Sequence, residues 1–243
     1  MSAAALSALW MSLQLAALTL AIATPLATAL AWWMAKASWR GKLLLDATIL
    51  LPMGLPPAAI GLWLLISLSE QGALGHWLRH DIGWVVPLYP SGAVLAACLM
   101  TVPMMTRMLR PAFEALDPML QPVARTLGAT GWHAWRTVTL PLTLPAIGSA
   151  MALGFVAAWG ESGAVLVLAN GLPGDPQLDA PPTVTLAIWQ SVVSGPPHAM
   201  ARELAALSLG VATAAILLSE RLRWQWQHRW QGSARMDWRA ARP

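Results

Sequence analysis

The chain has 243 residues, of which 57% are hydrophobic and 11% are charged, against roughly 25% charged residues in soluble domains. This composition excludes a disordered chain, argues against an ordinary soluble enzyme, and predicts an all-α integral membrane protein. The formal net charge of +4 is compatible either with nucleic-acid binding or with basic loops at a membrane surface. The single cysteine, Cys98, excludes an internal disulfide and a cysteine-based metal site.

Long runs without charged residues locate the membrane spans, because a helix needs about 20 apolar residues to cross the hydrocarbon core. The first 35 residues carry no charge and lack the basic start of a signal peptide, so they predict a retained first helix. We expect a transmembrane domain over residues 1–222, followed by a basic tail over residues 223–243. Its five spans are predicted at residues 9–34, 47–69, 86–108, 142–168 and 201–222.

Lysine and arginine are distributed unequally between the two sides of this arrangement, since only Arg79 and Arg202 lie on one side. The other 13 of the 15 are Lys36, Arg40, Lys42, Arg107, Arg110, Arg125, Arg136, Arg221, Arg223, Arg229, Arg235, Arg239 and Arg242. The positive-inside rule therefore places the N-terminus outside and the C-terminus in the cytoplasm. Because membrane topology explains the excess of basic residues, we expect no nucleic-acid partner.

The segment 183–193 is apolar but short, and it lies between the proline pairs 181–182 and 196–197. A sixth span at this position would place the arginine-rich tail outside the cell. We therefore predict an interfacial or re-entrant helix on the outer side of the membrane.

The second predicted span contains three prolines within six residues, Pro52, Pro56 and Pro57. Proline kinks a helix, and the carbonyls that it frees must be satisfied by protein or by water in a cavity. The pattern predicts a bent helix that faces the interior of the bundle, either as a wall or hinge of a transport pathway or as a kink without a gating role. Glu161 is the only carboxylate well inside an apolar stretch. We interpret it as an internal hydrogen-bonding or gate-packing residue, with a direct role in transport as the alternative.

The cytoplasmic loop over residues 109–141 has the pattern of two short helices rather than of a span. Asp117 is a suitable N-cap, so the first helix is predicted over residues 118–127. Gly128 fits the left-handed position that ends a helix, and the second helix is expected to begin near Thr130. Such an element, joined to the third and fourth spans, could transmit force from a soluble partner.

This loop resembles the cytoplasmic loop of ABC importer permeases, which has the pattern E-A-A, three residues, G, nine residues, I, one residue, L-P. Here the pattern is carried by Pro122-Val123-Ala124, Gly128, Val138 and Leu140-Pro141, with Pro122 where the family has Glu. The resemblance implies a coupling helix seated in a groove of a partner ATPase, and a passive interfacial helix is the alternative. The coupling residues that it implies are Ala124, Arg125, Thr126, Gly128, Ala129, Leu140 and Pro141.

Other stretches resemble the molybdate-type oxyanion permeases, although sulfate permeases share much of the same pattern. These stretches are residues 40–42, 50–57, 71–75, 124–129, 160–164 and 185–188. Two departures lie in the predicted outer half, Ser162 in place of the frequent Phe and the proline-rich insert 174–182. They weaken the assignment of the substrate more than the assignment of a transporter.

The resemblance implies a five-span type I importer permease for molybdate or tungstate, with sulfate or another oxyanion as the alternative. It also implies a homodimer in the bacterial inner membrane, two copies of an ABC ATPase that uses ATP and Mg²⁺, and an extracytoplasmic substrate-binding protein. Pro52, Pro56, Pro57 and Glu161 are the candidate pathway residues. No cofactor is expected to bind this chain itself.

No catalytic motif is visible in the sequence. The five histidines form no metal-ligand spacing, and the chain lacks the Gly-x-x-x-x-Gly-Lys-Ser/Thr phosphate loop of an ATPase. We therefore expect a non-catalytic subunit. The alternatives are a membrane-embedded enzyme, which needs a charged catalytic cluster at one membrane face, and a secondary transporter, which usually shows internal repeats and charges at mid-membrane.

Overall fold

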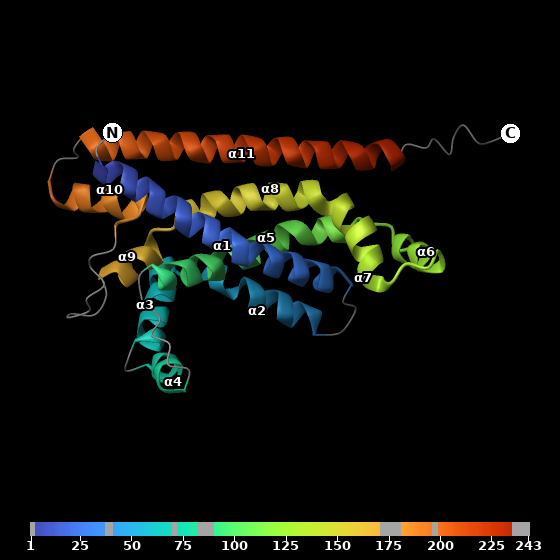
Figure 1. Ribbon diagram of the computed structural model, residues 1–243, viewed down its shortest axis with the longest axis horizontal. Coiled ribbons are helices and arrows are strands. Elements are labelled where there is room, and N and C mark those ends of the chain that lie inside the picture. Colours follow the sequence, from blue (N-terminus) through green and yellow to red (C-terminus); the bar gives the residue numbers. More distant parts are fainter. Residues whose placement is uncertain are drawn as a thin grey trace.

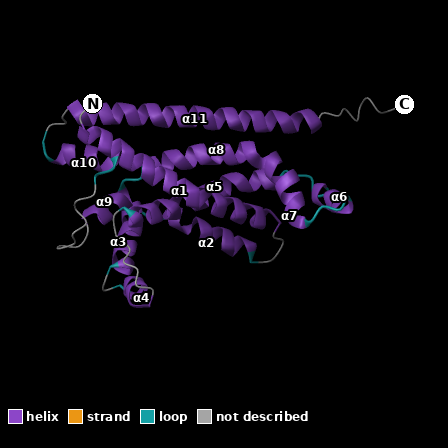
Figure 2. Cartoon of the chain, in the orientation of Figure 1, coloured by secondary structure: helices purple, strands orange, loops and turns teal. Residues whose placement is uncertain are grey.

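The computed structural model describes residues 3–36, 41–69, 72–81, 90–170, 181–195 and 199–234, and the regular elements in these ranges are all helices (Figure 1 and Figure 2). Arg40, Gln71, the first residues of the predicted third span, most of the proline-rich insert and the tail after residue 234 lie outside the described residues. The helices in chain order are α1 (Ala3–Lys36), α2 (Lys42–Gly54), α3 (Pro57–Leu68), α4 (Ala73–Asp81), α5 (Ser91–Glu114), α6 (Leu120–Thr126), α7 (Gly131–Ala134), the π-helix η1 (Trp135–Thr139), α8 (Leu140–Trp159), α9 (Gly163–Asn170), α10 (Val184–Val193) and α11 (Ala199–Ala234).

Among the described residues, four stretches are long and apolar enough to cross a membrane, and a fifth is obtained if α2 and α3 count as one span. The four are α1, α5, residues 131–159 and residues 199–225. Helix α5 continues to Glu114, beyond the predicted end of the third span at residue 108. The charge of Arg110 in this extension is compensated within the protein. Its Nη1 donates to both carboxylate oxygens of Asp46 at 2.8 Å, and its Nε donates to Glu114 at 2.7 Å.

The second predicted span is two helices rather than one bent helix. The axes of α2 and α3 differ by 96°. Leu55 is extended, with φ −88° and ψ 144°, as is typical of a residue before proline. Pro57 then occupies the start of α3, where its missing N–H costs no helical hydrogen bond. Pro52 is accommodated inside α2.

The fourth predicted span, residues 142–168, is also interrupted, because α8 ends at Trp159 and α9 begins at Gly163. In contrast, the predicted end of the last span at residue 222 is not a helix end, since α11 continues to Ala234. The predicted short helix over residues 183–193 is present as α10, and its position on the outer side of the membrane stays a prediction. Its start is held to α1, because the Val184 N–H donates to Ser12 Oγ at 2.8 Å.

α1 packs along α5 and α8 through a face of small side chains. These buried residues recur every three or four positions and are Ala8, Ser12, Ala16, Thr19, Ala23, Ala27 and Ala31. Small residues let helix backbones approach closely, which stabilises helix pairs in lipid, where the hydrophobic effect gives no drive for association. α11 lies against α8 along the outer edge of the bundle (Figure 1), where Ser149 and Ser219 exchange a buried hydrogen bond of 2.8 Å.

α3 and α9 pack with their backbones in contact. A Cβ atom added to Gly61 would lie 2.8 Å from Cα of Ala164, and one added to Gly163 would lie 2.7 Å from Cβ of Pro57. Both distances are shorter than real Cβ contacts, so these two glycines set the separation of the helices.

We therefore expect Gly61→Val to destabilise the protein by about 1–3 kcal/mol, because backbone atoms of α9 must shift to admit the side chain. Thermal unfolding of the purified full-length chain in detergent measures this loss. Gly210→Val on α11 is the matched control, since a Cβ at that position meets no atom within 4 Å. Equal unfolding temperatures for the two variants would contradict the close packing of α3 and α9.

Candidate functional site: the coupling element and the interrupted helices

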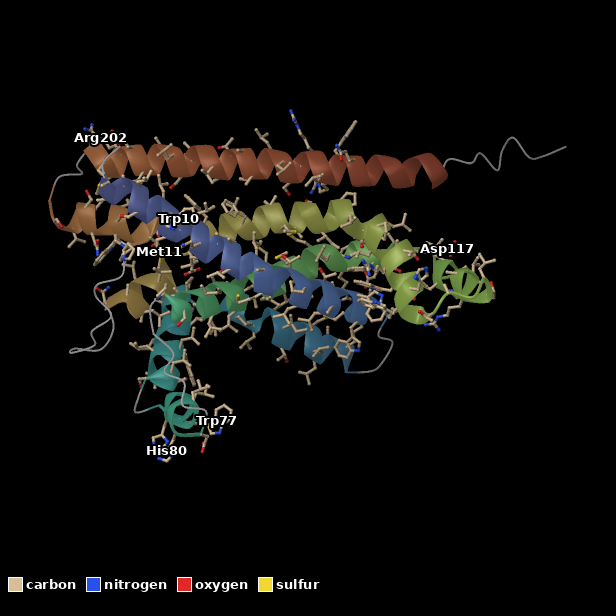
Figure 3. All side chains as sticks on the ribbon, viewed as in Figure 1. Trp10, Met11, Trp77, His80, Asp117 and Arg202 are labelled. Carbon is tan, nitrogen blue, oxygen red and sulfur yellow. The ribbon has the colours of Figure 1, made fainter. Side chains whose placement is uncertain are left out.

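The predicted coupling element lies at one end of the molecule, beyond the ends of α1, α5 and α8 (Figure 1). Figure 3 shows Asp117 at this end and Arg202 at the opposite end. The Asp117 carboxylate accepts a hydrogen bond from the Met119 N–H at 2.8 Å, as an N-cap does. Residues 118 and 119 form a turn, however, so regular helix begins at Leu120 rather than at Pro118.

Gly128 ends α6 in the left-handed conformation, with φ +91°. The Gly128 N–H donates to Arg125 O at 3.0 Å, and the Ala129 N–H donates to Ala124 O at 3.1 Å. These two bonds define a Schellman motif, in which the free carbonyls of the last helical turn are satisfied. Four of the coupling residues implied by the resemblance thus form the turn that reverses the chain after α6.

The second predicted helix begins where the sequence indicates, because Thr130 Oγ1 caps α7 by accepting from the His133 N–H at 3.2 Å. It is not a separate helix, since α7 continues through η1 into α8. The Leu140 N–H donates to Trp135 O, five residues earlier, which widens the helix. This wider turn directly precedes Pro141, which has no N–H to donate and crowds the carbonyl four residues before it.

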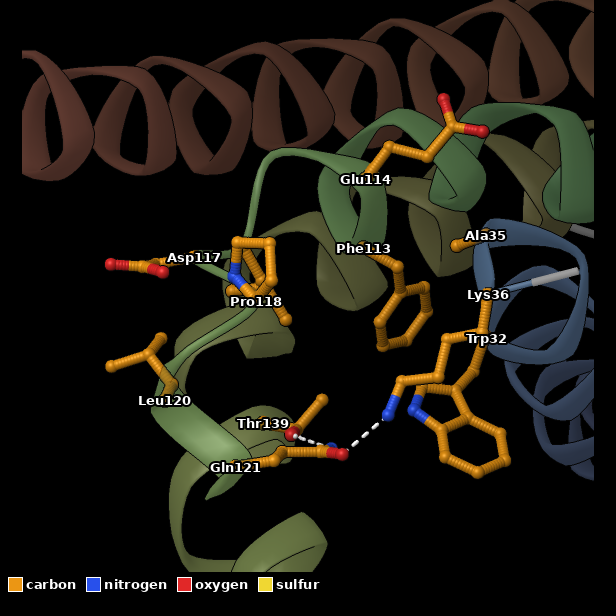
Figure 4. Close-up of a pocket in the computed structure, with 11 residues that line it drawn as sticks. Trp32, Ala35, Lys36, Phe113, Glu114, Asp117, Pro118, Leu120, Gln121 and Thr139 are labelled. Carbon is orange, nitrogen blue, oxygen red and sulfur yellow. Dashed lines mark hydrogen bonds between the residues drawn. The ribbon is translucent and has the colours of Figure 1, made fainter. Parts of the chain in front are cut away.

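Gln121 links the coupling element to the helix bundle through its side chain. Its Oε1 accepts from Lys36 Nζ at the end of α1, and its Nε2 donates to Thr139 Oγ1 in η1 at 2.8 Å. Figure 4 shows this chain of hydrogen bonds beside a cavity of about 410 Å³. Neither Gln121 nor Lys36 was among the predicted site residues, because nothing in a linear pattern shows that residues 36, 121 and 139 meet.

The face of the coupling element that points away from the helix bundle carries exposed apolar side chains. Met119, Val123 and Leu127 are 61%, 51% and 83% exposed, respectively. They recur at four-residue intervals and so lie on one face of α6 and its flanking turns; we call them the outer stripe. Their four-residue spacing in the sequence indicates an apolar helix face. The family pattern, however, highlights the residues of the turn and not this face.

Backbone groups at the interruption between α8 and α9 find hydrogen-bond partners within the protein. Glu161 Oε1 accepts from the Ala164 N–H at 3.0 Å and so caps α9, while its carbonyl accepts from Thr185 Oγ1 in α10 at 3.2 Å. The side chain of Glu161 therefore has the internal hydrogen bond that the sequence indicated. Its contribution to transport stays a prediction.

The two interruptions lie side by side, because Gly163 at the start of α9 contacts Pro57 at the start of α3. Of the candidate pathway residues, Pro57 and Glu161 therefore belong to one region, and Pro56 adjoins it as the residue before α3. Pro52 lies one helical turn earlier, inside α2. Within the described part of the chain, no group of three or more His, Cys, Asp or Glu side chains could hold a metal ion.

Residues 27–222 match the family described as the binding-protein-dependent transport system inner membrane component. The chain belongs to this family. It is therefore a multi-pass component of the inner membrane. The all-α fold is shared with a chain of a bacterial ABC transporter involved in the import of the acidic polysaccharide alginate, with a TM-score of 0.71 at 17% identity over 94% of this chain and 80% of that chain.

The resemblance to molybdate-type permeases is confirmed over nearly the full length. The molybdenum transport system permease protein of Escherichia coli K12 is 34% identical over 213 residues, 88% of this chain and 91% of the relative. The corresponding protein of Haemophilus influenzae is 32% identical over 88% of this chain and 92% of the relative. The sulfate transport system permease protein of Escherichia coli K12 is 36% identical, but over 59% of this chain and 51% of the relative.

The capping bond of Glu161 predicts different effects for two substitutions. Glu161→Ala removes the acceptor for the Ala164 N–H and is expected to lower the stability by about 1 kcal/mol, as for other lost helix caps. Glu161→Gln keeps an acceptor oxygen and should retain most of that stability. Unfolding temperatures of the two purified variants measure the difference. If glutamine is as damaging as alanine, the negative charge at the start of α9, rather than the capping hydrogen bond alone, supplies the stability.

Proposed function

We propose that this chain is the membrane-spanning permease of an ATP-driven importer for molybdate or tungstate. The observation that carries the proposal is the similarity to molybdenum permeases over about nine-tenths of both chains. Sulfate permeases match a shorter part, which makes sulfate or another oxyanion the second candidate. ATP and Mg²⁺ are used by a partner subunit, and this chain binds no cofactor.

The outer stripe is the proposed binding site of the ATPase. A groove in a soluble partner can bury exposed apolar side chains on a short helix, which is a common mode of helix recognition. The motif residues Ala124, Arg125, Thr126, Gly128 and Ala129 hold the shape of this element, and Leu140-Pro141 connects it to α8. Movement of the ATPases on binding ATP would then displace α6 as a rigid body, with the free energy coming from tighter ATP binding to one state.

The second copy of the chain is proposed to bind against α2 and α3. α2 has no buried residue, although it is apolar, and Leu43, Leu44 and Trp63 are among the most exposed large side chains of these helices. A homodimer would place the paired interruptions of both copies beside a shared pathway. Two coupling elements would then receive two ATPase subunits.

The proposed orientation has the coupling element in the cytoplasm and the N-terminus outside. The described cations Lys36, Lys42, Arg110 and Arg125 support it, because their contacts place them at the coupling end. The opposite end, with α9 and α10, would face an extracytoplasmic binding protein. One related alginate transporter has been captured in complex with a substrate-bound periplasmic protein.

Val123→Asp is expected to reduce retention of the ATPase more than tenfold, because docking would bury an unpaired carboxylate. Retention of the ATPase subunit on affinity-purified permease measures the effect. Val192→Asp is the matched control, since Val192 is 56% exposed on α10, at the far end of the bundle. Undiminished retention in Val123→Asp would contradict docking at the outer stripe.

The cargo is tested by elemental analysis of cells that lack the gene. Growth on trace molybdate should give a marked fall in cell-associated molybdenum, measured by mass spectrometry, which high external molybdate restores. A growth defect on limiting sulfate with unchanged molybdenum would instead favour the sulfate alternative.

A further inference from the structure

A groove between α1 and α8 is distinct from the outer stripe and from the interrupted helices. It encloses about 730 Å³ and is lined by side chains from α1, α6, the α7–η1 segment and α8. The polarity of its lining changes along its length. Pro25, Ala29, Leu144 and Ile147 make one part apolar, whereas Lys36 and Arg125 line the end beside the coupling element.

The end beside the coupling element has the chemistry of an anion site. Lys36 and Arg125 are both exposed, and the described lining of the groove includes no carboxylate. Lys36 contacts two neutral groups, the Gln121 amide and the Trp32 ring, 4.7 Å from the ring centroid. The Trp32 Nε1 is buried without a hydrogen-bond partner. Two cations thus lie together where neither has a counter-ion among the described lining residues.

The length of the groove matches one leaflet of a bilayer. From Thr24 to Lys36 the lining follows α1 for about 18 Å. Half of the hydrocarbon core is roughly 15 Å thick. Trp32, Trp132 and Trp135 line the same groove near its charged end, as expected for aromatic rings at the level of the lipid headgroups.

We propose that this groove binds one anionic phospholipid, with the headgroup phosphate between Lys36 and Arg125 and an acyl chain along Pro25, Ala29 and Leu144. A free oxyanion would use the charged end but would leave the long apolar part uncovered, so the shape of the groove favours a lipid. Only the assignment to the cytoplasmic leaflet rests on the proposed function. The lipid would hold the inner side of α6, while the outer stripe stays free for the ATPase.

Native mass spectrometry of the purified full-length chain in detergent tests the proposal, with phosphatidylglycerol and phosphatidylethanolamine as probes. Wild-type protein should retain one phosphatidylglycerol in preference to phosphatidylethanolamine. Lys36→Gln combined with Arg125→Gln should weaken that binding about 25-fold, at about fivefold for each cation near an anionic lipid. Arg107→Gln combined with Arg136→Gln removes the same charge outside the groove and should leave the preference intact.

Ala29→Trp supplies a second test that changes no charge. A large ring on the exposed Ala29 occupies the apolar part of the groove and should displace the lipid while Lys36 and Arg125 remain. Equal phosphatidylglycerol binding by wild type and both groove variants would overturn the proposal. So would binding of inorganic phosphate or molybdate that needs Lys36 and Arg125 when phosphatidylglycerol shows no preference, because the site would then be one for free oxyanions. Neither measurement depends on an ATPase or on uptake, so the lipid proposal and the transport proposal can fail separately.

Discussion

The structure depends on satisfying backbone groups where helices are interrupted inside an apolar environment. Lipid supplies no hydrogen bonds, so every N–H and C=O freed by a break must find a partner in the protein or in a water-filled cavity. At the first break the Pro56 carbonyl accepts from the Ala59 and Ile60 N–H groups, at 2.8 and 3.3 Å. At the second break Glu161 and Thr185 provide the partners. The two breaks are in contact through Pro57 and Gly163. The non-helical backbone between α2 and α3 and that between α8 and α9 therefore lie in one compact region.

The coupling element is joined to the bundle by more than its covalent connections. The α6 helix is short, and a helix of this length has little stability of its own. The Schellman turn at Gly128 fixes its exit, and Gln121 fixes its inner face to α1 and η1. A force applied to the outer stripe therefore reaches α1, α5 and α8 together. The motion proposed for transport requires such a rigid connection between a small docking surface and several spans.

Charge-free runs and local capping rules were sufficient to predict that long apolar helices form, that a short helix follows residue 183, and that a glycine turn lies at residue 128. These features depend on residues that are close in sequence. A bend at Pro52, Pro56 and Pro57 was predicted, but a complete break with an angle of 96° between two helices was not. Proline can either kink a helix or end it, and the local sequence does not distinguish the two. The π-helix and the links of Gln121 were also missed, since they depend on contacts between distant segments. For the candidate site, the sequence indicated the turn residues but not the exposed face beside them.

The length of α11 has a practical consequence for work on this protein. With 36 residues it extends about 54 Å, more than the 40–45 Å of a whole bilayer. The bond between Ser149 and Ser219 fixes its register, so about 22 Å of helix follow Ser219 toward the coupling end (Figure 1). A fluorescent protein or affinity tag attached at the end of α11 therefore lies at the same end of the molecule as α6. Such a fusion will compete for space with any subunit seated there, and a cleavable tag at the N-terminus, at the opposite end of the molecule, avoids the conflict.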